Sequence, residues 1–178
     1  MTDTDSSLAH SMKQSPEHSA HKEEVSIRVA TESDVPALVR LINAAFIVER
    51  FVFDGDRIGA EETQKLMQSG KFLVASDASG FAGCVYVELR EGRGYLGLLA
   101  VDPSRQGKGF GRELVCAAEE YFRAEGCSAV DLRIISPRTP LPTFYARLGY
   151  VVTGTAPFSP TLKTKVPGHY IVMSKELV

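Results

Sequence analysis

A nearly unbroken apolar run passes directly into a glycine-rich turn, and this junction constrains the fold more than any other feature of the chain. Residues 95–101 read Tyr-Leu-Gly-Leu-Leu-Ala-Val, which is typical of a strand covered on both faces. Pro103 ends the strand, and residues 106–111 read Gln-Gly-Lys-Gly-Phe-Gly. A helical stripe follows, made of Leu114, Val115, Ala118, Tyr121 and Phe122. Because the first N–H groups of a helix have no internal partners, this strand-turn-helix unit predicts an anion site suited to phosphate.

Two familiar phosphate-binding motifs do not fit the turn. The Gly-Lys-Ser/Thr of a P-loop is absent, and Arg112 stands where a dinucleotide fingerprint needs its third glycine. The chain also lacks the alternating strands and helices of a doubly wound sheet. A nucleotide-binding protein of another kind is therefore disfavoured, and what remains is a turn built on Gln106, Gly109 and Gly111.

Hydrophobic periodicity gives the order of the remaining elements. Strands are expected at 25–29, 71–76, 80–89, 95–101, 129–135, 150–155 and 169–174. Helices are expected at 35–46, at 60–68, from the glycine turn to Gly126, and at 143–148, with a proline-rich loop before the last one. Thr31 is the expected N-cap of the first helix. The order predicts a mixed α/β sheet with helices on both faces.

The 178 residues predict one folded domain preceded by a tail. Residues 1–24 are polar and carry two lysines against five acidic side chains, which predicts disorder. Their net charge is 2 − 5 = −3, so the domain at 25–178 carries −2 − (−3) = +1. We expect a chain that starts near Val25 to fold by itself. His10, His18 and His21 lie in the tail at spacings that fit no compact metal site, so no metal is expected.

Composition excludes several classes of protein. A net charge of −2 is unlike that of a dedicated nucleic-acid binder. No apolar run is long enough to span a bilayer, and the N-terminus does not read as a secretory signal. Three cysteines without a C-x-x-C pair indicate free thiols in a reducing compartment. A cytoplasmic protein without membrane or nucleic-acid partners is the expectation.

The turn and a second motif together resemble the GNAT superfamily of acyl-CoA N-acyltransferases. Leu-Leu-Ala-Val-Asp-Pro precedes the glycine turn at 98–103, and Phe-Tyr-Ala-Arg-Leu-Gly-Tyr follows at 144–150. Both motifs occur in the order and spacing of that family, and the resemblance covers residues 25–178. It implies a mostly antiparallel mixed sheet in which a central parallel pair of strands splays apart beside a bulge.

The resemblance also implies acetyl-CoA as the co-substrate. The pantetheine arm would lie in the opening between the splayed strands, and the turn would hold the pyrophosphate through its backbone N–H groups. The implied cofactor-binding residues are Leu99, Ala100, Val101, Gln106, Gly107, Lys108, Gly109, Phe110, Gly111 and Arg112. The side chains of Lys108 and Arg112 either add charge near the phosphates or are simply solvated.

Tyr145 is the implied catalytic residue, as the general acid that protonates the departing thiolate. Its reference pKa near 10 suits a proton donor better than a base at neutral pH. On spacing alone, an ordinary aromatic core patch explains residues 144–150 better, and it is the motif match that favours a catalytic Tyr145. Some relatives carry a glutamate base early in the strand before the turn, but here that region reads Gly94-Tyr95-Leu96. The base is left open between Glu88, His169, Asp54, Asp56 and water.

Two functions remain open from the sequence. The first is an acetyl-CoA-dependent N-acetyltransferase that acts by direct attack of a small-molecule or protein amine. The second is a catalytically silent acyl-CoA-binding sensor. The acidic segment with Glu49, Asp54 and Asp56 hints at a cationic acceptor. The resemblance also allows a homodimer formed through the last strands.

Overall fold

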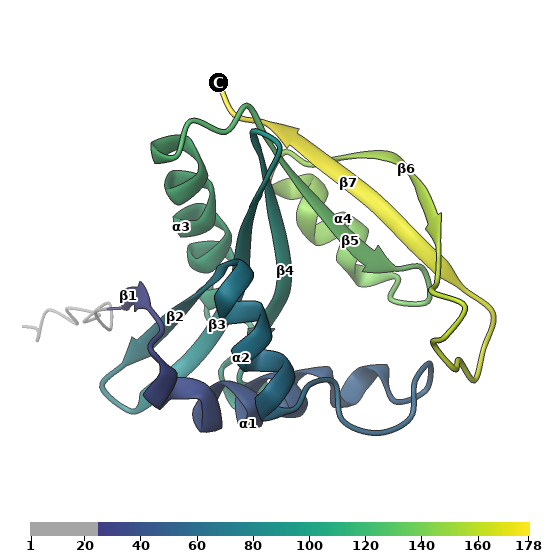
Figure 1. Cartoon of the computed structure of the whole chain (residues 1–178), viewed down its shortest axis with the longest axis horizontal. Helices are drawn as coiled ribbons and strands as arrows, with labels where there is room; N and C mark the ends of the chain where they lie inside the picture. Colours follow the sequence, from purple (N-terminus) through teal and green to yellow (C-terminus); the bar gives the residue numbers. More distant parts are fainter. Residues whose placement is uncertain (1–24) are drawn as a thin grey trace, which may run out of the picture.

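One seven-stranded sheet organises the computed structural model, which describes residues 25–178; the expected tail lies outside them. The strand order is β1-β2-β3-β4-β5-β7-β6, and only the β4–β5 pair is parallel (Figure 1). The strands are β1 (Ser26–Val29), β2 (Lys71–Asp77), β3 (Gly80–Arg90), β4 (Arg93–Val101), β5 (Ala129–Ile135), β6 (Val151–Pro157) and β7 (His169–Glu176). The mixed sheet predicted from the sequence is confirmed.

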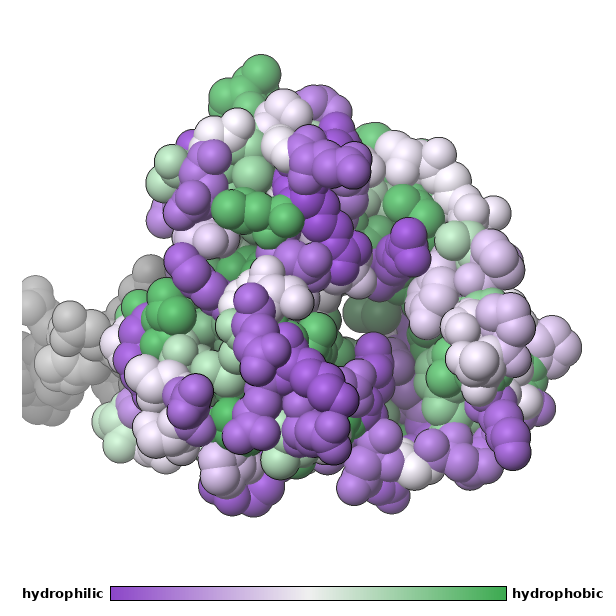
Figure 2. Space-filling view, in the orientation of Figure 1, coloured by the Kyte–Doolittle hydropathy of each residue, from purple (hydrophilic) through white to green (hydrophobic). Residues whose placement is uncertain are grey.

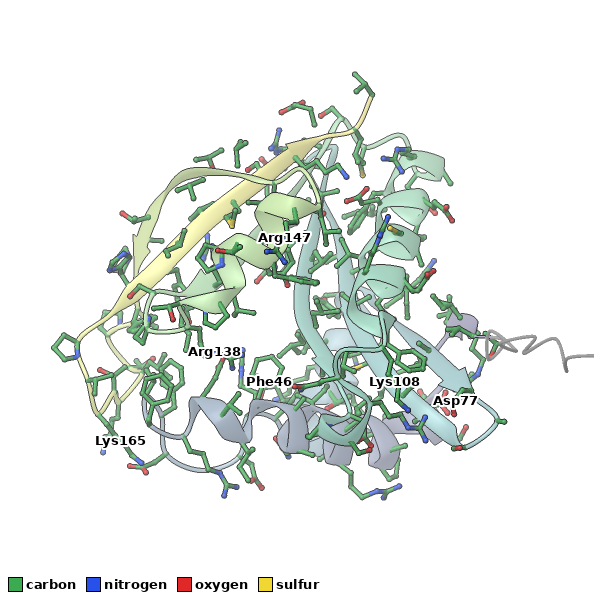
Figure 3. The ribbon with its side chains drawn as sticks, turned by 180° about the vertical axis from the view of Figure 1, so that it is seen from behind. Phe46, Asp77, Lys108, Arg138, Arg147 and Lys165 are labelled. Atoms are coloured by element: carbon green, nitrogen blue, oxygen red, sulfur yellow. The ribbon has the colours of Figure 1, made fainter. Side chains whose placement is uncertain are left out.

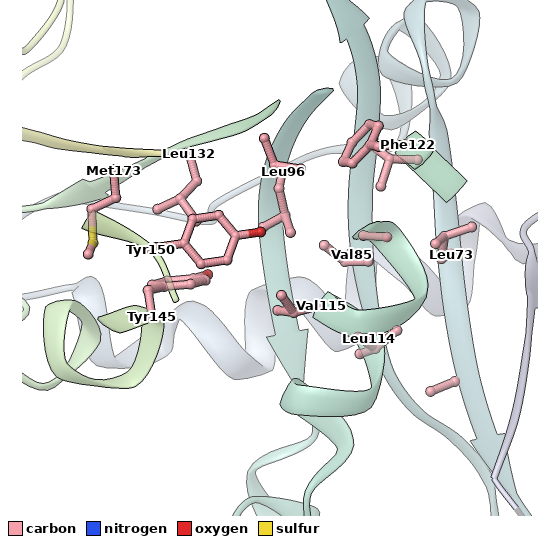
Figure 4. Close-up of a cluster of buried hydrophobic side chains, with 14 of the residues drawn as sticks. Leu73, Val85, Leu96, Leu114, Val115, Phe122, Leu132, Tyr145, Tyr150 and Met173 are labelled. Carbon is pink, nitrogen blue, oxygen red and sulfur yellow. The ribbon is translucent and has the colours of Figure 1, made fainter. Parts of the chain in front are cut away.

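Helices lie on both faces of this sheet. They are α1 (Val35–Phe46), α2 (Ala60–Ser69), α3 (Phe110–Ala124) and α4 (Pro140–Arg147). Alternating side chains of the strands form two cores, as the period of two requires. Phe72 and Tyr86 pack with α1 and α2, whereas Leu73 and Val85 pack with α3 and Tyr145. Figure 4 shows the second core, in which Tyr145 and Tyr150 lie beside Leu132 and Met173.

The start of α1 is fixed by a short 3-10 turn, η1 (Glu32–Asp34). Asp34 accepts hydrogen bonds from the Thr31 backbone N–H and hydroxyl, at 2.8 and 3.1 Å. Arg28 on β1 donates two more to the same carboxylate, at 2.7 and 2.9 Å. Thr31 therefore caps the 3-10 turn rather than α1 itself. The Arg28–Asp34 pair ties the first strand to the start of the first helix.

The last helix differs from its prediction. The prolines at 140 and 142 were expected in a loop, but α4 begins at Pro140 and includes both. The reason is that N–H groups of the first helical turn have no carbonyl to bind, so a proline there loses nothing. The earlier start extends α4 along the opening beside β5.

Candidate active site

Strands β4 and β5 separate along their length and leave a gap at the centre of the sheet. They pair only through Gly94, Tyr95 and Leu96. Beyond that point β4 shifts register against β3 between Cys84 and Tyr86, which marks a bulge. Leu98 has a φ of 46°, which is uncommon for a residue other than glycine. The bulge turns β4 away from β5, as the resemblance implied, and leaves this edge of β4 without a strand partner.

The gap is the core of a cleft of about 750 Å³ that collects most of the residues singled out in the sequence. Figure 2 shows it as a hollow between the half of the molecule that carries α1 and α2 and the β6–β7 pair. The expected cofactor residues that line it are Leu99, Val101, Gln106, Gly107, Gly109, Phe110, Gly111 and Arg112. Ala100 and Lys108 do not line it, since Ala100 packs into the α1 core and Lys108 is exposed on the loop (Figure 3).

The glycine turn opens α3 with free space in front of it. Gly109 is the N-cap with a φ of 94°, and Gly107 has a φ of 80°. A Cβ on either residue would meet no protein atom within 4 Å. Glycine is thus needed here for the left-handed backbone rather than for lack of room in the protein. The open space, the first N–H groups of a 15-residue helix and its positive dipole end together form a seat for an anion.

The loop before this turn is held by contacts that the sequence did not predict. Arg105 pairs with Asp77 at 2.9 Å and donates to the carbonyls of Ser79 and Gly80 at 3.1 Å each. Asp102 accepts from the backbone N–H of Ser104 at 2.8 Å. The β2–β3 turn therefore fixes the start of the glycine loop. The Arg105–Asp77 pair spans 28 positions, so no local pattern could have found it.

Tyr145 lies on α4 across the gap from β4, and its hydroxyl is the only polar atom of that side chain. The ring packs edge-on against Phe144 and Tyr150, with centroids 5.0 and 5.7 Å apart. Within residues 25–178 the hydroxyl has no hydrogen-bond partner. The Tyr145 hydroxyl is also not fully enclosed by protein. Among residues 25–178, the Tyr150 hydroxyl is the only fully buried side-chain oxygen or nitrogen that has no hydrogen-bond partner. Burial raises the pKa of Tyr145, which keeps its proton in place at neutral pH.

None of the residues considered as a base from the sequence lines the cleft. Glu88 accepts from Arg90 and Tyr86, and His169 is exposed at the start of β7. Asp54 and Asp56 pair with Lys165 and Arg50 on the surface.

Glu49 is the acidic residue of that segment that does line the cleft. It belongs to the 3-10 turn η2 (Ile47–Glu49) and is only 7% exposed. Arg138 lies 3.6 Å from its carboxylate. Burial raises the pKa of Glu49 above its ordinary value, against the opposing charges of Arg138 and Arg57. Figure 3 shows Arg138 facing Phe46 across the opening at this end of the cleft.

Four arginines at the Glu49 end of the cleft were not expected from the sequence. The four that line the cleft are Arg57 and Arg138 on loops, Arg90 at the end of β3 and Arg133 on β5. No sequence pattern joins them, because they meet only when the sheet forms.

Other chemistry has little support in the described part of the chain. Cys84 is fully buried in the α1 core, and burial raises the pKa of its thiol, so it behaves as a packing residue. Residues 25–178 contain no group of three metal-ligating side chains. No helix among them has the length and apolar character needed to cross a bilayer.

Comparison with known proteins agrees with this arrangement. The acetyltransferase (GNAT) family model matches residues 36–150. A mycothiol acetyltransferase of Saccharopolyspora erythraea is 31% identical over 124 residues, which are 67% of this chain and 41% of that protein. One of Propionibacterium freudenreichii is 28% identical over 131 residues, covering 70% and 42%. The chain thus spans less than half the length of these relatives.

Solved structures share the fold. The ribosomal-protein-S18-alanine N-acetyltransferase of Escherichia coli superposes with a TM-score of 0.71 at 16% identity, covering 86% of this chain and 94% of that one. A Salmonella typhimurium structure with acetyl-CoA gives 0.69 at 19% identity, covering 87% and 95%. The family match, the splayed parallel pair and the glycine turn lead to one conclusion: the chain belongs to the GNAT acetyltransferase family.

Proposed function

We propose that the chain transfers the acetyl group of acetyl-CoA to an amine by direct attack of the amine on the thioester. The observation that carries this proposal is that one cleft is lined both by the glycine turn at the N-terminus of α3 and by Tyr145 on α4. An acyl-CoA reaction needs a phosphate site, a channel for the pantetheine arm and a proton donor. We assign these roles to the glycine turn, the β4–β5 gap and Tyr145, which share this cleft.

Acetyl-CoA would bind along the β4 side of the gap. Its pyrophosphate would accept hydrogen bonds from the N–H groups of Gly107 to Arg112, and its pantetheine amides would pair with the edge of β4 at Leu99 and Val101. These backbone groups have no strand partner on β5. The Val101 carbonyl accepts a hydrogen bond from the Gln106 side chain at 3.3 Å, which an extended ligand would replace. Phe144 and Leu141 on α4 supply the apolar wall opposite.

The chemical step would use Tyr145 and Glu49. The amine nitrogen forms a bond to the thioester carbon, whose oxygen takes the negative charge. The C–S bond then breaks, and the Tyr145 hydroxyl protonates the sulfur. Glu49 accepts the proton that the amine loses. Because its pKa is raised, Glu49 is a stronger base than an ordinary carboxylate, and its pKa lies closer to that of the amine. A chain of water molecules could replace Glu49, and the pH profile distinguishes the two.

The test is a thiol-release assay with acetyl-CoA and a panel of amines. The panel includes a mycothiol-type acceptor, because the relatives carry that name. We expect at least one amine to accelerate CoA release and to appear as its amide. Tight binding of acetyl-CoA with no acceleration by any amine would instead favour a silent acyl-CoA sensor.

A further inference from the structure

Positive charge gathers at the end of the cleft that holds Glu49, which we call the acceptor end, without enough negative charge to neutralise it. Arg57, Arg90, Arg133 and Arg138 line this end, and the carboxylates there are Glu49 and Glu62. Arg138 lies 3.6 Å from Glu49, and Arg90 donates to Glu88 at 2.8 Å. Within residues 25–178, neither Arg57 nor Arg133 takes part in an ion pair.

Three of these arginines, Arg57, Arg90 and Arg133, line the cleft together with Tyr95. The positive charges of Arg90, Arg133 and Arg57 all lower the pKa of Tyr95, against the larger effect of its burial. The Arg90 guanidinium lies 3.6 Å from the centre of the Tyr95 ring. The Arg57 guanidinium lies 5.5 Å from the ring of Phe46 on α1. Stacking on aromatic rings holds a guanidinium in place while its N–H groups stay free to bind.

A second hollow of about 500 Å³ opens beside Tyr95 and is lined by residues of β4, β5, β6 and β7. It shares Arg90, Tyr95, Leu132 and Arg133 with the main cleft. Arg93 in this hollow is already neutralised by two hydrogen bonds to Asp131, at 2.7 Å each. Arg133 therefore stands at the junction of the two spaces with its charge unpaired, where it can reach a ligand in either.

The side chains of Arg57 and Arg133 are exposed at the cleft, so their unpaired charges are accessible to an anion. Their planar forks match carboxylate and phosphate oxygens. We propose that the acceptor is an anionic amine, whose carboxylate or phosphate binds between Arg57 and Arg133 while its amino group faces Glu49. This inference rests on the proposed acetyl transfer and names its substrate class. It replaces the cationic acceptor suggested by the acidic segment, because Asp54 and Asp56 lie outside the cleft and Glu49 is paired with Arg138.

The experiment compares matched amines that differ only in the anionic group. O-phosphoethanolamine is compared with ethanolamine, and an α-amino acid with its amide, so that the phosphate and carboxylate arms are read separately. A diamine represents the cationic class. Each is assayed with the parent chain, with Arg57→Gln, with Arg133→Gln and with Arg40→Gln. The last is the control, since Arg40 is an exposed α1 residue outside the cleft and loses the same charge.

We expect an anionic amine to be the better substrate in at least one arm. Each cleft variant should lower kcat/KM for it by about tenfold to a hundredfold, the range for a charged hydrogen bond. The neutral partner should change less than about threefold, and Arg40→Gln should leave both unchanged. Preference for the neutral or cationic amine would overturn the inference while leaving acetyl transfer intact. So would a loss of acetyl-CoA affinity in the cleft variants, which would assign these arginines to the co-substrate.

A binding arm separates the two proposals. Calorimetry of O-phosphoethanolamine and the amino acid with the acetyl-CoA complex needs no turnover. Binding that Arg133→Gln abolishes, without any acetylation, would support the anion site and contradict the transferase. Absence of both binding and turnover for the anionic amines would contradict the inference.

Discussion

Removing the hydroxyl of Tyr145 is the sharpest perturbation that the structure offers, because it changes one atom in the cleft. The Tyr145→Phe variant keeps the edge-on contacts with Phe144 and Tyr150. The hydroxyl has no hydrogen-bond partner within residues 25–178, so its loss should change the free energy of unfolding by less than about 0.5 kcal/mol. Any large effect must then come from the reaction.

The expected effect is on kcat. Loss of a general acid lowers the rate about 10²-fold to 10⁴-fold, which is about 3 to 5 kcal/mol of transition-state stabilisation. KM for acetyl-CoA should change little, because the hydroxyl interacts chiefly with the sulfur as it gains charge. Steady-state thiol release with an accepted amine measures both constants, and a thermal melt checks the fold.

Tyr150→Phe provides the matched control. Tyr150 lies in the same motif and contacts Tyr145, but it does not line the cleft. Its hydroxyl is enclosed without a hydrogen-bond partner, so the variant should be as stable as the parent or more stable. Turnover of Tyr145→Phe within about twofold of the parent, or an equal loss of activity in both variants, would show that the Tyr145 hydroxyl is not the acid.

Three further changes test other parts of the account. Gly111→Val keeps an ordinary helical backbone, unlike the left-handed Gly109, and its Cβ would meet Phe144 at 3.5 Å. We expect a near-parental melting temperature and an acetyl-CoA affinity that is roughly tenfold weaker or more by calorimetry. An unchanged affinity would contradict a phosphate site at the glycine turn. Glu49→Gln should lower kcat and remove the acid limb of the kcat/KM profile, whereas an unchanged profile would assign the proton to water. Asp34→Asn should lower the free energy of unfolding at pH 7 by about 1–2 kcal/mol in denaturant titrations. The hydrogen bonds from Arg28 hold the pKa of Asp34 below its usual range, so this stabilisation is present at neutral pH and is lost as the pH falls through the lowered pKa. A deficit that persists in strong acid would contradict that assignment.

The elements along the chain could be predicted because each carries its own local signal. Alternating Val25, Ile27 and Val29 gave the first strand, and the glycine turn gave the start of α3. The start of α4 was missed because a proline ends a helix in its interior but is tolerated in the first turn, and the sequence alone does not say which case applies.

The site was predictable only where a motif carries it. The glycine turn and Tyr145 each lie in a short motif that resembles the family, and the structure brings both to one cleft. The Arg105–Asp77 anchor and the pairing of Glu49 with Arg138 join residues far apart in the chain. Such contacts depend on the closure of the sheet, and no periodicity or spacing reports them.

Transfer of a labelled acetyl group is the measurement that tests the central claim most directly. The chain is mixed with acetyl-CoA labelled in the acetyl group and an amine from the panel, and the products are quantified by mass spectrometry. We expect labelled amide and free CoA in equal amounts, both lost together in Tyr145→Phe. Free CoA without labelled amide would show hydrolysis of the thioester, and bound acetyl-CoA that never releases its acetyl group would show a binding module; either result would contradict the account.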